Sequence, residues 1–401
     1  MRIGHIKILP SNKSRRLKYR TFMTNTDTFI IGAGAAGLAS AVCLQKEGIE
    51  FIVIEKSLQV ANAWRHHYDR LHLHTSKKWS ALPFKKFDAS LPQYPSRQNV
   101  VDYLDKYAEE FIIHPVFDTE VLSVKRENEF WITRTSSGTY RSPNVIVATG
   151  MNNKPAIPKW EGLSSFKGAI LHSSQYKNGS PFTGKNVLVV GFGNSGGEQA
   201  ICLHEHGAHP SLSVRSTVNV LPRDILGVPV LELGKLTSKL PARIADKMNA
   251  PLIRMLVGDI TKLGLKKSPY GPREQIEKQK RIPLLDVGTI KLIREGNIKV
   301  YGDVLRIAGN TVFFEDNKQD NFDAIILATG YRHNLESILS PDDERMKDLN
   351  KPVSQQQLFG KDGFYFCGFY VSPMGMLREI GIEAKKIAKD IARKKSISGS
   401  P

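Results

Sequence analysis

The chain has 401 residues, of which 41% are hydrophobic and 24% are charged. This length and composition exclude an intrinsically disordered protein and allow two or more packed domains. The formal net charge of +18 falls to +11 without the seven positive charges of residues 1–22. The remaining charge is spread over the chain without a run of five or more like charges, which argues against a nucleic-acid partner. No stretch of about 18 uninterrupted apolar residues occurs, so the sequence predicts no transmembrane segment.

Residues 1–22 form a basic leader that contains seven Lys or Arg residues and no Asp or Glu. The leader is either a targeting peptide or a dispensable extension, and it lacks the apolar stretch of a secretory signal. The three cysteines, Cys43, Cys202 and Cys367, are far apart in the sequence. Because this spacing argues against a disulfide framework and against a zinc site, we expect no metal and a cytoplasmic protein.

Residues 28–55 predict a βαβ unit, in which an apolar strand, a glycine-rich turn, a helix and a second apolar strand follow one another. Gly32 permits the tight turn, Gly34 lets the backbone approach a pyrophosphate, and Gly37 lets the helix pack closely on the strand. The helix N-terminus offers unpaired N–H groups to phosphates. Glu55 follows Gly32 by 23 residues, near the offset of about 20 expected for an acid that binds ribose hydroxyls. The predicted site comprises Gly32, Ala33, Gly34, Ala35, Ala36, Gly37, Glu55 and Lys56.

Several shorter stretches predict further strands. Aromatic or branched residues at 121–125, 130–135 and 311–314 favour small antiparallel sheets beside the main ones. Two apolar strands, at 145–150 and 325–330, both end in Ala-Thr-Gly. We expect the chain to leave the first sheet after the former strand and to re-enter it at the latter.

Residues 185–215 predict a second βαβ unit with the same glycine spacing. Its second strand ends in Arg215 and Ser216, where the first unit has Glu55. A carboxylate would repel a 2′-phosphate, whereas a guanidinium can bind it bidentately, so this ending favours NADPH over NADH. The alternative for Arg215 is a solvated arginine at the end of a strand. The predicted site comprises Gly191, Phe192, Gly193, Asn194, Ser195, Gly196, Arg215 and Ser216.

These units predict an α/β fold with two Rossmann-like dinucleotide-binding domains, the NADPH domain being inserted into a discontinuous FAD domain. FAD and NADPH in one chain imply hydride transfer from nicotinamide to flavin. A disulfide reductase of similar layout would need a Cys-x-x-Cys pair, which this sequence lacks. The expected order is a leader at 1–22, the first part of the FAD domain at 23–160, a linker at 161–180, the NADPH domain at 181–322, the second part of the FAD domain with a C-terminal helix at 323–395, and a tail at 396–401.

Residues 166–176 resemble the F-x-G-x-x-x-H-x-x-x-Y fingerprint of class B flavin monooxygenases, with Phe166, Gly168, His172 and Tyr176 at its fixed positions. The likeness extends over residues 28–391 toward the YUCCA branch, the plant flavin monooxygenases of auxin synthesis and their bacterial relatives. The segments that carry it are YDRLHLH at 68–74, LPRDILG at 221–227, LVGD at 256–259, LGLKK at 263–267 and PLLDVG at 283–288.

The resemblance implies an NADPH-dependent monooxygenase in which NADPH reduces FAD and oxygen forms a flavin hydroperoxide that is sheltered from water. In the YUCCA branch this oxidant decarboxylates indole-3-pyruvate, an aryl 2-oxo acid, to indole-3-acetate. Two alternatives stay open: N- or S-oxygenation of small soft nucleophiles, and a redox protein that performs no oxygenation. The expected partners are a small-molecule substrate and molecular oxygen, and a homodimer is a candidate assembly.

The resemblance also suggests roles for single residues. His74 and Asn194 are candidate catalytic residues, although His74 could equally be a structural histidine. Trp64 lies where relatives wrap the flavin, and His172 is expected to brace the domain interface rather than to transfer protons. Residues 368–376 depart from the basic, glycine-rich stretch of the plant relatives, which leaves the flavin contacts and the choice of substrate open.

Overall fold

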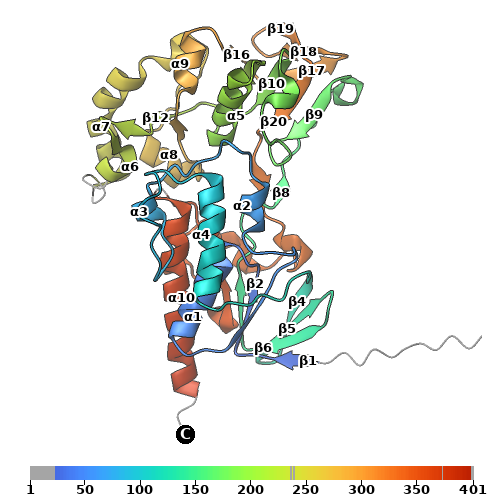
Figure 1. Cartoon of the computed structure of the whole chain (residues 1–401), viewed down its shortest axis with the longest axis vertical. Coiled ribbons are helices and arrows are strands. Elements are labelled where there is room, and N and C mark those ends of the chain that lie inside the picture. Colours follow the sequence, from blue (N-terminus) through green and yellow to red (C-terminus); the bar gives the residue numbers. More distant parts are fainter. Residues whose placement is uncertain (1–22, 235–236, 238–239, 373, 399–401) are drawn as a thin grey trace, which may run out of the picture.

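The computed structural model describes residues 23–234, 237, 240–372 and 374–398, which form two lobes stacked along the long axis of the molecule (Figure 1). Each lobe contains one parallel sheet with helices on one face and a smaller sheet on the other, which is mixed in the first lobe and antiparallel in the second. This architecture confirms the predicted α/β class with two Rossmann-like folds. The predicted leader 1–22 and residues 399–401 of the predicted tail lie outside the described residues.

The first lobe is built on four parallel strands in the order β22 (Phe364–Phe366), β7 (Asn144–Val147), β2 (Thr28–Ile31) and β3 (Phe51–Ile54). All four residues of β2 are buried because both faces of the sheet are covered. Ile30 packs into the cluster under the helices, whereas Phe29 and Ile31 pack into the cluster on the opposite face. Because successive side chains of a strand point to opposite faces of the sheet, the apolar residues of β2 contribute to the hydrophobic cores on both faces.

The two faces of this sheet are covered differently. Helices α1 (Ala35–Lys46), α4 (Arg97–Glu110) and α10 (Met376–Ser398) pack over one face, and α10 lies along α1 (Figure 1). The other face carries a second sheet in the order β1, β6, β5, β4, whose strands span Met23–Asn25, Thr139–Ser142, Phe130–Thr135 and Val121–Glu127. Two of these strands match the stretches predicted at 121–125 and 130–135. The C-terminal helix docks on this lobe, as expected, and it extends to Ser398.

The second lobe is built on five parallel strands in the order β16 (Lys299–Tyr301), β11 (His209–Ser213), β10 (Asn186–Val190), β20 (Ala324–Leu327) and β9 (Ala169–His172). Its cores repeat the arrangement of the first lobe. One face packs on α5 and α9, which span Asn194–Glu205 and Thr289–Arg294. The other packs on β17, β18 and β19, which span Val304–Ala308, Thr311–Phe314 and Gln319–Asn321.

Residues 220–286 form a helical layer beside the second sheet. Strand β12 (Val220–Pro222) pairs with β15 (Leu284–Asp286), and the hairpin β13 (Asp224–Ile225) and β14 (Val228–Pro229) follows β12. The helices of this layer are α6, α7 and α8, at Val230–Leu233, Ala242–Val257 and Pro272–Gln279. Shorter pieces elsewhere are α2 (Asn62–His66), α3 (Lys77–Ser80), β8 (Lys154–Pro155), β21 (Tyr331–Arg332) and the 3-10 helices η1 (Leu163–Ser165), η2 (Ser180–Phe182), η3 (Ile260–Leu263), η4 (Leu335–Ser337), η5 (Glu344–Asp348), η6 (Val353–Gln355) and η7 (Lys361–Gly363).

Two expectations about the chain path are wrong. The strand at 325–330 does not re-enter the first sheet, because β20 lies between β10 and β9 in the second sheet. The strand that returns to the first sheet is β22. The segment 161–180 is more than a linker, since β9 within it forms an edge of the second sheet. Both strands at 145–150 and 325–330 are equally apolar and end alike, so their sequences do not distinguish the sheet to which each belongs.

Candidate active site

The turn between β2 and α1 has three glycines with three different surroundings. Gly32 has a φ of 103°, and a Cβ there would lie 2.9 Å from the carbonyl oxygen of Ala148. A Cβ on Gly37 would lie 1.8 Å from the carbonyl oxygen of Gly32. Gly34, in contrast, has ordinary extended backbone, and a Cβ there would meet no atom within 4 Å, so the protein itself gives no reason for glycine. The open space in front of Gly34 is where an approaching ligand would require glycine.

Helix α1 begins at this open space without a capping side chain. Gly34 is its N-cap residue, and the first turn contains no acid. The unpaired N–H groups and the helix dipole therefore offer a partial positive charge. A pyrophosphate would satisfy both the charge and the free donors.

Glu55 lies beside the same turn and is almost buried. Its Oε2 accepts a hydrogen bond from the N–H of Ala33 at 2.8 Å, and its Oε1 accepts hydrogen bonds from the N–H and hydroxyl of Ser57 at 3.0 and 2.8 Å. A carboxylate has about four acceptor positions, so the anchored group can still accept ribose hydroxyls. Lys56 is exposed next to it, and Trp64 on α2 packs on the core of the first lobe.

The turn between β10 and α5 repeats this geometry in the second lobe. Gly191 has a φ of 107°, and a Cβ there would lie 2.4 Å from the carbonyl oxygen of Ala328. A Cβ on Gly196 would lie 2.1 Å from the carbonyl oxygen of Gly191, whereas a Cβ on Gly193 would have nothing within 4 Å. Gly193 is the uncapped N-cap residue of α5. Each of the two glycine turns therefore has one glycine that the surrounding protein does not require, at the start of a helix where a ligand would approach.

Asn194 and Phe192 in this second turn have structural contacts. The Asn194 Oδ1 accepts a hydrogen bond from the N–H of Leu285 at 2.9 Å, which ties β15 to the start of α5. Phe192 is buried in the core of the second lobe. The Asn194 side chain thus positions the helical layer, and its predicted catalytic role has no geometric support here.

Arg215 and Ser216 follow β11, at the same edge of the sheet as the glycine turn. The Arg215 side chain is 76% exposed, and its Nε lies 3.9 Å from the Oδ2 of Asp303. The sequence interpretation missed Arg281, which lies close enough for Arg215 to lower its pKa, after the larger effect of burial. Arg281 also donates to the carbonyl oxygen of Thr217 at 3.3 Å. Two neighbouring guanidinium groups, one of them 3.9 Å from the Asp303 carboxylate, form a cationic end to this edge of the sheet, suited to a phosphate.

His74 lies at the interface of the lobes. Its Nε2 bonds to Oε1 of Glu198, a residue of α5 whose side chain is 5% exposed. Tyr68 is buried close by, and burial, followed by the charge of Glu198, raises the pKa of its hydroxyl above the ordinary range. His74 is thus the partner of a buried acid in the other lobe. This geometry favours the structural alternative over a catalytic one, and no pattern in the sequence had indicated Glu198.

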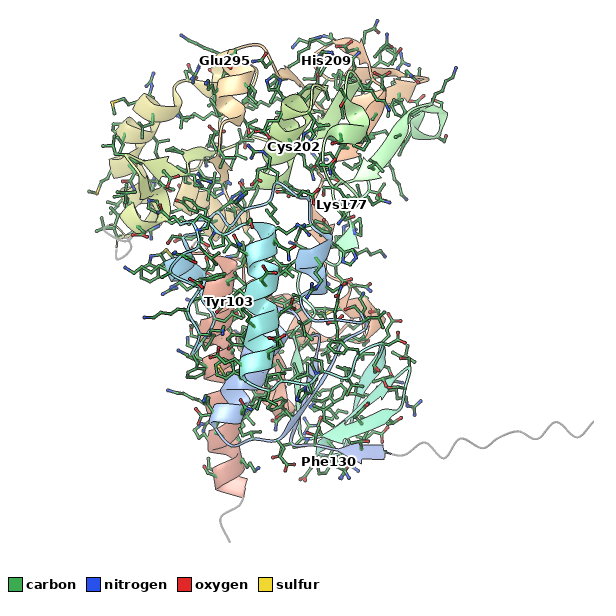
Figure 2. The ribbon with its side chains drawn as sticks, in the orientation of Figure 1. Tyr103, Phe130, Lys177, Cys202, His209 and Glu295 are labelled. Carbon is green, nitrogen blue, oxygen red and sulfur yellow. The ribbon has the colours of Figure 1, made fainter. Side chains whose placement is uncertain are left out.

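Other contacts join the loop at 66–80 to the second lobe. Arg70 binds Glu205 bidentately, with distances of 2.9 and 2.8 Å to its carboxylate oxygens. Lys177, which Figure 2 labels between the lobes, donates to the carbonyl oxygen of His66 at 2.8 Å. The N–H of Asp69 donates to the carbonyl oxygen of Lys177 at 2.9 Å. The loop at 66–80 of the first lobe is therefore bonded to α5, the helix that follows the second glycine turn, and to Lys177.

The fingerprint residues are distributed through the core of the second lobe. Phe166 and Tyr176 are buried in its two apolar clusters, and a Cβ on Gly168 would lie 2.2 Å from the carbonyl oxygen of Asp323. His172 bonds through Nε2 to the carbonyl oxygen of Gly330 at 3.0 Å, and its Nδ1 accepts from the N–H of Ser174 at 3.2 Å. Burial lowers the pKa of His172. A neutral imidazole with both nitrogens occupied supports the expected bracing role.

His172 braces the crossing between the lobes. Gly330 directly precedes β21, which pairs antiparallel with β8 in a two-stranded ribbon. The Thr329 hydroxyl donates to the carbonyl oxygen of Ala156 at 2.6 Å, across the same ribbon. The chain thus passes between the lobes on two adjacent, hydrogen-bonded strands.

The C-terminal part of the site contains a buried carboxyl group. Glu383 on α10 is 1% exposed, and its Oε2 accepts from the N–H of Gly368 at 2.7 Å. Burial raises the pKa of Glu383 to about 8, Glu379 acts in the same direction, and the Gly368 bond and Lys386 act against it. Gly368 lies against Ala36 in the first cofactor turn. The Glu383 carboxyl group therefore holds the backbone of Gly368, just after β22, in place beside the glycine turn between β2 and α1.

We expect the stability of the protein to fall as pH rises through about 8, because the folded-state pKa of Glu383 lies above its ordinary value of 4.5. The folded protein then binds the proton more tightly than the unfolded chain, and the contribution of Glu383 is full below its unfolded pKa and lost above its folded pKa. Between about pH 5 and pH 8, the melting temperature of Glu383→Gln should fall less than that of the wild type. Exposed Glu109→Gln is the control, and identical pH profiles for wild type and Glu383→Gln would contradict the assignment.

Neither a metal centre nor a membrane span is found within the described residues. No cluster of three or more His, Cys, Asp or Glu side chains there is arranged to hold a metal ion. No helix in the described part of the chain is long and apolar enough to cross a bilayer. The three cysteines are free and buried.

Comparisons with known proteins agree with this geometry. Residues 29–222 match the family described as pyridine nucleotide-disulphide oxidoreductase. The chain is 39% identical to the indole-3-pyruvate monooxygenase YUCCA6 of Arabidopsis thaliana over 378 residues, which cover 91% of this chain and 90% of that protein. It is 40% identical to the indole-3-pyruvate monooxygenase YUCCA8 of Oryza sativa subsp. japonica over 381 residues, which cover 90% of each.

Solved structures resemble the fold at lower sequence identity. A flavin-containing monooxygenase from Stenotrophomonas maltophilia matches with a TM-score of 0.69 and 21% identity, over 93% of this chain and all of that chain. An oxidized steroid monooxygenase bound to NADP matches with a TM-score of 0.72 and 19% identity, over 93% of this chain and 86% of that chain. From its sequence identity to full-length relatives, the chain belongs to the flavin monooxygenases, in the YUCCA family of indole-3-pyruvate monooxygenases.

Proposed function

We propose that the chain binds FAD at the first glycine turn and NADPH at the second, and that it oxidatively decarboxylates an aryl 2-oxo acid such as indole-3-pyruvate. The observation that carries the two cofactor sites is the open space at Gly34 and Gly193, beside two glycines per turn that the protein needs for its own packing. The family membership supports the substrate class. A cytoplasmic location and a homodimer stay predictions of the sequence.

The first lobe would bind FAD, and the second lobe would bind NADPH. The N–H groups at the start of α1 and the Glu55 carboxylate would hold the pyrophosphate and ribose of FAD, and the start of α5 with Arg215 and Arg281 would hold those of NADPH. Bound FAD, once reduced, would supply the activation of oxygen. The contacts of His74, Arg70 and Lys177 would keep the lobes together and limit the access of water to the reacting rings.

Steady-state turnover tests the reaction. For each indole-3-pyruvate, one NADPH, one proton and one O₂ should be consumed, and one indole-3-acetate, one CO₂, one water and one NADP⁺ should form. A tertiary amine and a thioether serve as competing substrates for N- or S-oxygenation. Faster turnover of the amine or the thioether would indicate N- or S-oxygenation instead of decarboxylation. Hydrogen peroxide as the sole oxygen product would contradict a monooxygenase.

Arg215→Glu should lower kcat/KM for NADPH by about a hundredfold and leave that for NADH almost unchanged. The substitution removes a charge-assisted contact of about 1.5–3 kcal/mol and adds repulsion from the 2′-phosphate. Because Arg215 is largely exposed, the variant should fold normally. Arg134→Glu, at an exposed position of β5 in the first lobe, is the matched control. An unchanged preference for NADPH would remove the phosphate assignment.

A further inference from the structure

Helix α7 presents an apolar stripe to solvent. Ile244, Met248, Leu252 and Met255 are exposed by 49%, 60%, 40% and 73%, and Leu256 beside them by 42%. At about 100° per residue, the first four lie within about 80° of one another around the helix. Scattered exposed apolar residues are common on proteins, whereas a row of four on one helix face marks an interaction surface.

The apolar stripe does not pack on another element of the helical layer at 220–286, because α7 is attached to this layer through its opposite face. Ala242 and Val257 are buried on that face, and Ala245 is buried at the edge of the stripe. The Asp246 carboxylate accepts hydrogen bonds from the N–H groups of Arg273 and Glu274 at 3.1 and 2.9 Å, and so joins α7 to the start of α8. Helix α7 lies at the outer edge of the second lobe (Figure 1).

Basic side chains flank the stripe along one side. Arg243, Lys247 and Arg254 are exposed, and the same helical spacing places them together, about 60–100° from Ile244. The one acid within α7, Asp246, is buried and engaged with α8. The free half of α7 therefore combines an apolar stripe with basic residues and no exposed acid of its own, the pattern of a helix that lies in a membrane interface. Asp259, just beyond the end of the helix, is an exposed acid close to Arg254.

The charges decide among the possible occupants. A second copy packed antiparallel on this face about a two-fold axis would bring Lys247 and Arg254 of both chains to the same side, without an acid of α7 to neutralise them. The basic leader would be repelled in the same way, and β1, where the described chain begins, lies at the far end of the other lobe (Figure 1). Anionic lipid headgroups would neutralise the basic side chains of the flank, and the apolar side chains of the stripe would insert at the boundary between headgroups and acyl chains.

We propose that α7 docks this protein on an anionic lipid surface, with its apolar stripe inserted at the headgroup boundary and its basic flank on the headgroups. Docking would hold the second lobe against the surface and leave the first lobe outward. The proposal does not depend on the enzyme activity, because it rests only on the exposed half of α7.

Co-sedimentation of the full-length protein with vesicles tests the proposal. We expect binding to vesicles of phosphatidylcholine with phosphatidylglycerol, weak binding to phosphatidylcholine alone, and loss of binding at high salt. Met248→Glu/Met255→Glu should lower the partition coefficient at least about tenfold, because it removes the centre of the stripe and adds repulsion. Lys247→Gln/Arg254→Gln should lower it about fivefold for each charge.

Matched variants separate the site from overall charge. Leu122→Glu/Leu305→Glu changes two leucines exposed by 56% and 55% on strands far from α7, and Lys159→Gln/Lys185→Gln removes two exposed charges elsewhere. Both should bind as wild type does, and circular dichroism with thermal melting should show that all four variants fold. Equal binding to neutral vesicles, wild-type binding by both α7 variants, or a solution dimer that Met248→Glu/Met255→Glu dissociates would each overturn the proposal.

Discussion

Gly34→Val is expected to give a folded protein that purifies colourless and oxidises NADPH only at background rate. A Cβ at this position meets no protein atom within 4 Å, and the backbone has no unusual φ, so the fold should tolerate valine. It would fill the space through which the FAD pyrophosphate must approach the N–H groups of α1. Since all electrons to oxygen pass through FAD, loss of the flavin removes every turnover.

The measurement is the flavin absorbance per protein, before and after incubation with added FAD, together with a thermal melt. Gly138→Val is the matched control, because Gly138 also has nothing within 4 Å and lies in a hairpin turn of the small sheet. The control should purify yellow with wild-type activity. A yellow Gly34→Val protein would mean that the first turn does not bind the flavin.

Gly193→Val should separate the two cofactors: the protein keeps FAD but is no longer reduced by NADPH. The second turn repeats the geometry of the first, and a Cβ at Gly193 again meets no protein atom within 4 Å. The valine would block the backbone contacts to the NADPH pyrophosphate. Loss of two charge-assisted hydrogen bonds of about 1.5–3 kcal/mol each predicts a fall in kcat/KM for NADPH of about a hundredfold or more.

The flavin spectrum during anaerobic mixing with NADPH measures this loss directly. Chemical reduction by dithionite should still bleach the flavin of Gly193→Val at the wild-type rate, which shows that the flavin itself is intact. Gly138→Val again serves as the control. Rapid reduction of Gly193→Val by NADPH would place the nicotinamide cofactor elsewhere.

The sequence predicts most of the local structure around the two turns. Glycine spacing, apolar strands and Glu55 are all local signals, so the βαβ units and the α/β class follow from short stretches of chain. The strand at 311–314 is present as β18 with the same bounds. These features depend on backbone conformations that few residue types allow.

The remaining features depend on contacts between residues far apart in the sequence. Strands β7 and β20 lead into the same three residues, yet they lie in different sheets, because sheet membership is decided by neighbouring strands. The sequence supports two roles for His74 equally, and it gives no sign that Glu198, 124 residues away, is the partner of its side chain. Arg281 was missed because the loop between α8 and β15 brings it beside Arg215 without a local pattern that predicts this.

The position of β20 has a consequence for synthesis on the ribosome. All five strands of the second sheet have been made once residue 327 is complete, whereas the first sheet lacks β22 until residue 366 and its helix α1 lacks the cover of α10 until later still. The lobe that begins first along the nascent chain is therefore the last to be completed, and its FAD-type turn stays without its neighbours Gly368 and Glu383 while the inserted lobe can already fold.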